Sequence, residues 1–510
     1  MTSLVQSVDW LAIAPPTIAA VAGLIVLVTD LFVPARRKGV LAWIAVAGLV
    51  AASLALVPLL DGDRSTFCLT GDAAVCSYTA DRFTLVIQFL VLAGALVTAL
   101  LSVGPLRDSR GSDGELPAGE YWFLLLSATA GAALLPASRD LATLVIALEV
   151  ASLPAFALVG LRRGDRRSAE AALKFFLSSV VATAVTLLGA SFVYAATGTL
   201  HLTEIAARLD DVDPGLTTLA QTGVALTLVG FAFKTAAVPF HFWVPDTYIG
   251  APLPVAAYLS VVGKAVGFTG LILVTVVAFP SYAHVWGPVV AVLAALTMTV
   301  GNAAALRQAS TRAYSAVRLL AWSSVGQAGY LLVPIASAAY ADDASGAERA
   351  IGSTVAYALM YTAVNLGAFA VASLVARSHP RNRIDDYRGL YAERPLAALA
   401  LGFFLLCLAG LPPGIIGLFA KVTVFAAAVD AGLGWLAVVM AVNVVIALVY
   451  YLRWTAVLFR PRDDAPAVPQ QPAVRLPLPL TGAVALTAVV GIALSGAPQL
   501  VLRFSEGVLF

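Results

Sequence analysis

Long apolar segments alternate with short polar linkers along the whole chain. About fourteen of these segments are long enough to cross the ~30 Å apolar core of a membrane, which takes roughly twenty helical residues. They lie near residues 11–33, 40–60, 80–104, 120–137, 140–161, 170–196, 217–240, 252–279, 286–306, 314–338, 351–377, 395–428, 432–458 and 479–503. The pattern predicts an all-α polytopic membrane protein.

The polar linkers differ in charge according to the segments that they follow. Linkers after odd-numbered segments are basic, as in residues 36–38 and 162–167, except for the short connection after the seventh segment. Linkers after even-numbered segments are acidic, as in residues 61–72 and 204–213. Because basic linkers remain on the cytoplasmic side of a membrane, both termini are predicted to lie on the non-cytoplasmic side.

Composition supports this class and excludes others. Hydrophobic residues make up 60% of the chain and charged residues 12%, whereas a soluble domain carries roughly 25% charged residues. The net charge of +2 gives no basic face for nucleic acid, so no nucleic-acid partner is expected.

The three cysteines do not form a pattern typical of a metal centre. Cys68 and Cys76 share one polar linker, and Cys407 lies in an apolar segment, so neither an iron–sulfur cluster nor a zinc site is expected. No redox cofactor is therefore predicted in this chain. The linker with Cys68 and Cys76 is predicted to face an oxidising compartment, where a disulfide is one interpretation and two free thiols the other.

Four ionisable side chains lie deep in apolar segments: Glu149, Lys234, Lys264 and Lys421. At 1.5 Å of rise per residue, Lys264 lies ~17 Å into its segment and Glu149 ~12 Å. Charge at such depth is costly and usually functional, although a buried structural ion pair is the alternative. A desolvated ammonium loses its proton easily and a nearby carboxylate such as Glu149 favours its return, so these groups predict a proton relay.

Proline interrupts the seventh and twelfth segments close to two of the lysines. Lys234 lies five residues before Pro239, and Lys421 lies eight residues after the Pro412-Pro413 pair. A break inside a membrane frees carbonyls that can hold water beside an amine. The alternative is that the prolines only shape the helices.

Three further residues are candidates that also have structural explanations. Lys174 lies near the start of the sixth segment, where its amine can reach the membrane surface. His241 follows the first break and is either a solvated loop residue or a relay. Arg318 begins the tenth segment and is either a helix-end anchor or, with Ser323, Ser324 and Gln327 after it, part of a wet interior path.

The broken segments are five apart, which predicts an internal repeat. Five-helix units placed in tandem face opposite sides of the membrane, so segments 4–8 and 9–13 are expected to form an inverted pair. The predicted division is residues 1–117 for the first three helices, 118–285 and 286–462 for the two repeats, and 463–510 for a linker and the last helix.

Several stretches resemble the antiporter-like membrane subunits of proton-pumping NADH-quinone oxidoreductase, respiratory complex I. The most specific is Val-Pro-Phe-His-Phe-Trp-Val-Pro-Asp-Thr-Tyr-Ile-Gly-Ala-Pro at residues 238–252, which is similar to the subunit N branch of that family. Residues 149–154, 168–176 and 411–421 resemble its glutamate, lysine and broken-helix motifs. Two positions depart from the family pattern around Arg318, namely Val317 and Trp322.

The resemblance implies a role and partners for this chain. It implies that Glu149 and Lys234 form a coupled pair, with Lys264 as central relay and Lys421 as exit-side site. The chain is then a non-redox, proton-translocating subunit in the bacterial inner membrane, surrounded by lipid and bound to adjacent antiporter-like and small membrane subunits. NADH oxidation and quinone reduction, with FMN and iron–sulfur clusters, belong to other subunits.

Two other functions fit the same sequence. One is a subunit of a cation/proton antiporter complex or of a membrane-bound hydrogenase, since these share the fold and the lysines. The other is a structural spacer that only builds the membrane arm.

Overall fold

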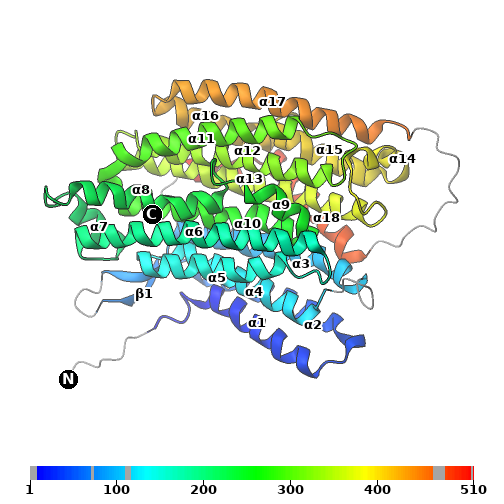
Figure 1. Cartoon of the computed structure of the whole chain (residues 1–510), viewed down its shortest axis with the longest axis horizontal. Helices are drawn as coiled ribbons and strands as arrows, with labels where there is room; N and C mark the ends of the chain where they lie inside the picture. The colour runs from blue at the N-terminus through cyan, green and yellow to red at the C-terminus, as the bar shows by residue number, and fades with distance from the viewer. Residues whose placement is uncertain (1–7, 70–73, 109–115, 463–476, 507–508, 510) are drawn as a thin grey trace.

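The chain folds into a bundle of helices that run nearly parallel to one long axis (Figure 1). The structure, a computed structural model, describes residues 8–69, 74–108, 116–462, 477–506 and 509. Within these residues, twelve helices are long and apolar enough to span a membrane. The predicted class, an all-α membrane protein of many spans, is confirmed. The number fourteen stays a prediction, because the helix of the seventh segment, Thr217–Thr235, is not among the twelve, and the twelfth segment is divided into helices of 15 and 16 residues.

The first half of the chain contains the helices α1 (Ala14–Phe32), α2 (Gly39–Leu54), α3 (Arg82–Asp108), α4 (Ala118–Leu134), α5 (Leu141–Val159), α6 (Arg166–Thr197), α7 (Leu202–Leu209), α8 (Thr217–Thr235) and α9 (Trp243–Gly250). The second half contains α10 (Leu253–Ile272), α11 (Ala283–Leu306), α12 (Ser315–Ala338), α13 (Ala344–Ala376), α14 (Leu390–Glu393), α15 (Pro395–Ala409), α16 (Ile415–Asp430), α17 (Gly434–Phe459), α18 (Leu478–Gly496) and α19 (Gln499–Leu502). α12 and α13 lie at the centre with most side chains buried, whereas α1, α2 and α18 expose apolar side chains on the outside.

Aspartates fix the start of three long helices. Asp140 accepts a hydrogen bond from the amide of Thr143 at the start of α5, and Asp165 accepts one from Arg167 at the start of α6. Asp343 does the same with the amide of Gly346 at the start of α13, and this bond lowers the pKa of Asp343. Each carboxylate satisfies a backbone donor that has no partner within the helix.

A β-hairpin between α2 and α3 departs from the all-helical prediction. Strands β1 (Arg64–Cys68) and β2 (Cys76–Ala80) pair antiparallel, with Cys68 opposite Cys76, and a disulfide joins these two cysteines. The Tyr78 hydroxyl donates a 3.0 Å hydrogen bond to the carbonyl of Ala12, which ties the hairpin to the start of α1. Burial raises the pKa of Tyr78 to about 12.

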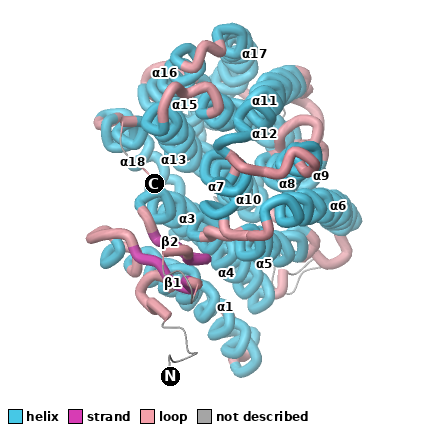
Figure 2. Tube along the Cα trace, turned by 90° about the vertical axis from the view of Figure 1, so that its left-hand side faces the viewer, coloured by secondary structure: helices cyan, strands magenta, loops and turns pink. Residues whose placement is uncertain are grey.

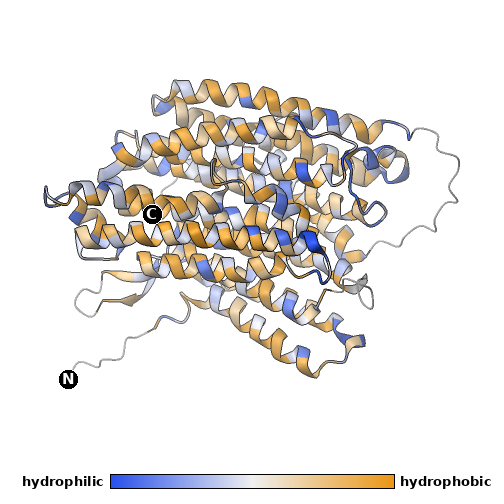
Figure 3. Ribbon diagram, viewed as in Figure 1, coloured by the Kyte–Doolittle hydropathy of each residue, from blue (hydrophilic) through white to orange (hydrophobic). Residues whose placement is uncertain are grey.

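The basic linkers meet at one end of the bundle. The guanidinium of Arg167 lies 4.8 Å from the ring centre of Tyr314, and the amide of Tyr314 donates to the carbonyl of Arg381 at 2.6 Å. The amide of Gly389 donates to the carbonyl of Arg460 at 2.8 Å. The linkers that follow α5, α11, α13 and α17 therefore share one end, which is strongly hydrophilic in Figure 3.

The opposite end gathers the hairpin, α7 and Leu509 near the C-terminus (Figure 2). The amide of Arg139 donates to the carbonyl of Ser77, and the amide of Leu202 donates to the carbonyl of Arg139, both at 2.9 Å. The amide of Phe83 donates to the carbonyl of Leu509 at 3.0 Å. Linkers after odd- and even-numbered predicted segments thus lie at different ends.

Candidate functional site

Both predicted helix breaks are present. α8 ends at Thr235, followed by Ala236 in the left-handed conformation at φ +68°, and the chain resumes as α9 at Trp243. α15 ends before Gly410, which has φ +85°, and α16 begins at Ile415. Each break also holds one cis peptide bond, Val238-Pro239 in the first and Pro412-Pro413 in the second. The breaks leave the carbonyl ends of α8 and α15 inside the bundle.

Lys264 binds the carbonyl end of α8. It projects from the middle of α10, its side chain is buried, and its Nζ donates a 3.1 Å hydrogen bond to the carbonyl of Thr235. The last carbonyls of a helix have no intrahelical donor and carry a partial negative charge. The end of α8 is therefore a favourable partner for an ammonium group.

Lys421 binds the carbonyl end of α15 in the same way. Its Nζ donates hydrogen bonds of 2.8 Å to the carbonyls of Leu408 and Ala409. The side chain is only 4% exposed, and Nζ lies 5.4 Å from the ring centre of Tyr330. Each broken helix thus presents its free carbonyls to one buried lysine.

Lys234 has a different environment, although it lies in the last turn of α8. Its Nζ lies 4.9 Å from the ring centre of Phe156 and 4.8 Å from that of Phe175. Phe175 in turn stacks on Trp243 with ring centres 4.2 Å apart. Among the described residues, no hydrogen bond or ion pair to Nζ is present, so aromatic faces are the closest partners of this amine.

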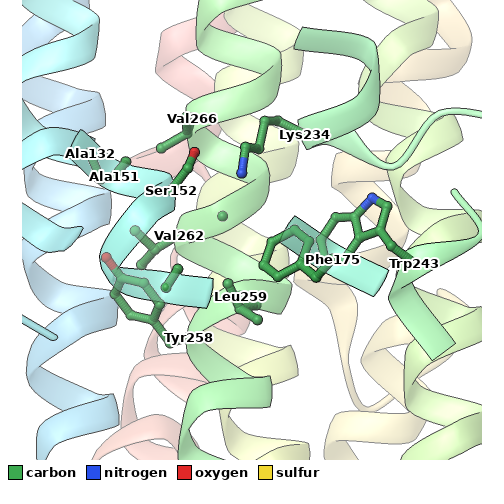
Figure 4. A pocket seen from close by; sticks show the side chains of 12 residues that line it. Ala132, Ala151, Ser152, Phe175, Lys234, Trp243, Tyr258, Leu259, Val262 and Val266 are labelled. Carbon is green, nitrogen blue, oxygen red and sulfur yellow. The ribbon is translucent and has the colours of Figure 1, made fainter. Parts of the chain in front are cut away.

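A small cavity adjoins Lys234. It encloses about 20 Å³, enough for about one water molecule. Figure 4 shows the Lys234 amine directed into this cavity, with Ser152 and Tyr258 on one side and Phe175 and Trp243 on the other. The remaining lining is apolar, so the cavity offers few polar contacts to a water molecule.

Glu149 lies half-buried on α5 and is oriented by α6. Its Oε1 accepts a 2.6 Å hydrogen bond from the hydroxyl of Thr183. Glu149 interacts electrostatically with Lys234, but among the described residues no ion pair joins them within 4.0 Å. The structure therefore places the predicted pair near one another without direct contact. Thr183 could not be predicted from the sequence, because its partner lies 34 positions away.

Lys174 lies apart from the buried lysines. Its side chain is 49% exposed, and Nζ forms ion pairs of 2.8 Å with Glu170 and 2.9 Å with Asp246 of α9. α6 has 32 residues and extends ~48 Å, longer than the ~30 Å apolar core. A residue two turns from its start therefore lies close to the membrane surface. Asp246 had no predicted role, since only helix packing brings it to Lys174.

His241 and Arg318 lie in the first helix break and in the first turn of α12. The imidazole of His241 lies in the first break, 5.6 Å from the ring centre of Trp322, and interacts electrostatically with Lys264. Arg318 lies in the first turn of α12 and interacts electrostatically with Asp246. Within the described part of the chain, neither Nδ1 of His241 nor Nε of Arg318 has a hydrogen-bond partner.

The described residues contain no cluster of three His, Cys, Asp or Glu side chains that could hold a metal ion. The site consists instead of three amines and one carboxyl group within the helical bundle. Three of the chain's five lysines are buried there. Such an arrangement can bind, hold and release protons, because each group changes charge by taking up one proton.

Comparisons with known proteins identify close relatives of the chain. Residues 138–447 match the family model described as "NADH:quinone oxidoreductase/Mrp antiporter, TM". The chain is 74% identical to NADH-quinone oxidoreductase subunit N 2 of Streptomyces griseus subsp. griseus, over 100% of the chain and 95% of that relative. It is 46% identical to NADH-quinone oxidoreductase subunit N of Salinispora tropica, over 91% of the chain and 88% of that relative.

Solved structures share the fold. One chain of respiratory complex I from Thermus thermophilus with bound aureothin matches with a TM-score of 0.74 and 32% identity, covering 97% of this chain and all of that chain. A chain of the Mrp complex from Dietzia sp. DQ12-45-1b matches with a TM-score of 0.78 and 22% identity, covering 96% of each chain. At that identity the second match shows the fold alone.

Proposed function

We infer that this chain, which belongs to the NADH:quinone oxidoreductase/Mrp antiporter family of membrane subunits and within it to subunit N of NADH-quinone oxidoreductase, carries protons through its buried lysines. The chain itself performs no redox step. The energy comes from NADH oxidation and quinone reduction in other subunits of the complex. These subunits hold the FMN, the iron–sulfur clusters and the quinone.

One observation carries this proposal. Lys264 and Lys421 each donate to the free carbonyl end of a broken helix, at 3.1 Å and 2.8 Å. Burial favours the neutral amine, whereas the carbonyl end of a helix favours the ammonium. Because these two effects oppose each other, a small change in the charges near the lysine can decide whether its amine keeps the proton. A purely structural lysine needs no such balance.

The residues then act in sequence across the bundle. Glu149 and Lys234 form the coupled pair, because the carboxylate interacts electrostatically with the amine without binding it. A shift of Glu149 toward Lys234 holds a proton there, and a shift away releases it. Lys264 is the central relay and Lys421 the exit-side site. His241 lies next to the central relay, whereas Lys174 and Arg318 act near the membrane surface.

Two broken helices also support an inverted repeat. We place the repeats at residues 118–285 and 286–462, preceded by residues 1–117 and followed by residues 463–510. In this division each repeat contributes one broken helix whose carbonyl end faces a lysine. The repeats would open one half-channel to each side of the membrane.

Proton pumping in vesicles tests the proposal. Lys234→Ala and Glu149→Gln are expected to reduce pumping by at least about tenfold, since one lost charge interaction of roughly 1.4 kcal/mol already gives that factor. NADH oxidation with an artificial acceptor should be retained. Lys38→Ala is the matched control, because Lys38 binds Asp30 at a linker and not in the bundle.

Normal pumping by an assembled Lys234→Ala complex would instead support the spacer function. The antiporter alternative is tested by purification: recovery of the chain with small membrane subunits only, without flavin and iron–sulfur subunits, would favour it. The 74% identity to a subunit N favours the oxidoreductase.

We further propose that the basic end of the bundle faces the cytoplasm and that both termini face the other side. The support is the charge of the linkers and the positive-inside rule. A membrane-impermeant thiol reagent added to intact cells should label Asp63→Cys and not Arg163→Cys. The reverse labelling pattern would invert the orientation.

A further inference from the structure

A chain of buried neutral side chains begins beside Lys264. Ser260 precedes Lys264 by one helical turn on α10, so both side chains lie on the same face. The amide of Asn365 on α13 donates a 2.7 Å hydrogen bond from Nδ2 to the Ser260 hydroxyl. Tyr361 lies one turn before Asn365, on the same face of α13. Ser260 and Asn365 are fully buried and Tyr361 is nearly so.

The chain continues onto α12. The Tyr361 hydroxyl donates a 3.1 Å hydrogen bond to the hydroxyl of Ser324, and the hydroxyls of Tyr248 and Ser324 lie 3.4 Å apart. Gln327 follows Ser324 by three residues, which places both side chains on one face of the helix. The polar path thus crosses from α10 through α13 to α12 without an ionisable carboxyl or amine.

Gln327 ends the path at the carbonyl that holds Lys421. Its Nε2 donates to the Tyr451 hydroxyl at 3.1 Å and to the Leu408 carbonyl at 3.4 Å. Its Oε1 accepts a hydrogen bond from the Tyr357 hydroxyl. Lys421 donates to the same Leu408 carbonyl at 2.8 Å. One carbonyl oxygen therefore receives donors from both Gln327 and Lys421.

This shared acceptor fixes the orientation of the Gln327 amide. Turning the amide by half a rotation would place Oε1 against the Leu408 oxygen, and two acceptors cannot form a hydrogen bond. The orientation of the amide in turn determines the hydrogen bonds of two tyrosine hydroxyls: that of Tyr357 donates to Oε1, and that of Tyr451 accepts from Nε2. Loss of the Lys421 hydrogen bond therefore leaves Nε2 of Gln327 as the side-chain donor to the Leu408 carbonyl.

We propose that Gln327 is a positioning residue for Lys421 and the last member of a row of buried neutral polar side chains that couples Lys421 to Lys264. While the ammonium holds the Leu408 carbonyl, Gln327 shares it. When the amine has lost its proton and turns away, Gln327 keeps that carbonyl satisfied, so one of the two carbonyls that bind Lys421 at the end of α15 is not left unpaired. This inference rests on the proposed function, because it names how two of its lysines communicate.

A matched pair of variants tests the role of Gln327. Gln88, in α3, is also fully buried, and its Nε2 donates to the Ala133 carbonyl at 2.8 Å and to the Tyr78 hydroxyl at 3.2 Å, with no lysine at that carbonyl. Gln327→Leu is expected to lower the number of protons pumped per electron by about fivefold, the factor expected for one lost hydrogen bond. Gln88→Leu should keep the ratio of the unchanged complex. An unchanged ratio in Gln327→Leu, or an equal loss in Gln88→Leu, overturns the inference.

An infrared measurement separates positioning from packing. During turnover, the difference spectrum of the complex should contain a side-chain amide band that persists in Gln88→Leu. The band should be absent from Gln327→Leu and from Lys421→Ala, because the amide moves only when Lys421 does. Its persistence in Lys421→Ala overturns the inference. If Gln327→Leu does not assemble, Tyr451→Phe removes the hydroxyl that Gln327 binds and should lower the proton ratio, and an unchanged ratio overturns the inference.

The two proposals fail in different ways. Normal pumping by Lys421→Ala would remove Lys421 from the proposed relay and contradict the proposed function. Lost pumping by Lys421→Ala, with a normal proton ratio in Gln327→Leu, would contradict only the coupling through Gln327.

Discussion

The hydroxyl of Thr183 donates a 2.6 Å hydrogen bond to Oε1 of Glu149. This bond joins α5 to α6 and holds the carboxyl group in one orientation beside Lys234. Among the described residues it is the one hydrogen bond to the Glu149 side chain. The position of Glu149, and hence its effect on Lys234, therefore depends on a neutral residue of a neighbouring helix.

Thr183→Val should weaken pumping without removing any charge. Valine keeps the shape of threonine but not its hydroxyl, and a hydrogen bond to a charged group is worth about 1.5–3 kcal/mol. We expect pumping to fall by about tenfold, less than in Glu149→Gln. Thr222→Val is the control, because the exposed Thr222 donates only to the Thr218 carbonyl of its own helix. An equal loss in both variants would contradict the orienting role.

The helix breaks and the deep lysines could be predicted because their signals are local. Proline lacks a backbone donor wherever it occurs, so Pro239 and the Pro412-Pro413 pair indicate breaks without any knowledge of neighbours. The depth of Lys264 and Lys421 follows from the position of each lysine within an apolar run. Segment length and position were therefore sufficient for these features.

Partners could not be predicted in the same way. Lys264 binds the carbonyl of Thr235, 29 positions earlier, and Lys174 binds Asp246, 72 positions later. Such pairs depend on which helices pack against each other. The sequence does not indicate this, because most faces of these membrane helices are similarly apolar. The hairpin was also missed, because its five-residue strands, β1 and β2, are short and lie in a polar linker.

Gly267→Ala should destabilise the contact between α10 and the end of α8. A methyl group at Gly267 would lie 2.3 Å from the amide nitrogen of Thr235, the residue whose carbonyl binds Lys264. The end of α8 would have to move, at a cost of about 1–3 kcal/mol for overpacking. Gly263→Ala on the same helix meets only Leu259, at 3.6 Å, and should be tolerated. Thermal unfolding of the purified complex distinguishes the two, and equal stability would contradict the close packing.

Thiol labelling should detect the disulfide of the hairpin. Cys68 and Cys76 are expected to react with a thiol reagent in the intact protein only after reduction, because the structure joins them. Cys407 is buried in α15 and should react only after unfolding. Cys68→Ser should lower the stability of the hairpin by about 2–3 kcal/mol, the value for closing a loop of this size. Labelling that does not depend on the reductant would show free thiols.

The aromatic rings around Lys234 lead to the last prediction. Phe175 places its ring centre 4.8 Å from Nζ of Lys234 and stacks on Trp243. Because a buried cation gains about 2 kcal/mol from an aromatic face, Phe175→Leu should make the ammonium of Lys234 harder to form. We expect pumping to fall by about tenfold while NADH oxidation with an artificial acceptor is retained.

Phe231→Leu is the control for Phe175→Leu, because it removes a buried ring without removing an aromatic contact to Lys234. Phe231 is equally buried on α8, yet its ring packs on Gly270 and forms no described contact with a cation. Both substitutions remove similar apolar volume, so both should lower thermal stability by a similar amount. Only Phe175→Leu should reduce the number of protons pumped per electron. Equal pumping by the two variants would mean that the rings shape the cavity without acting on the charge of Lys234.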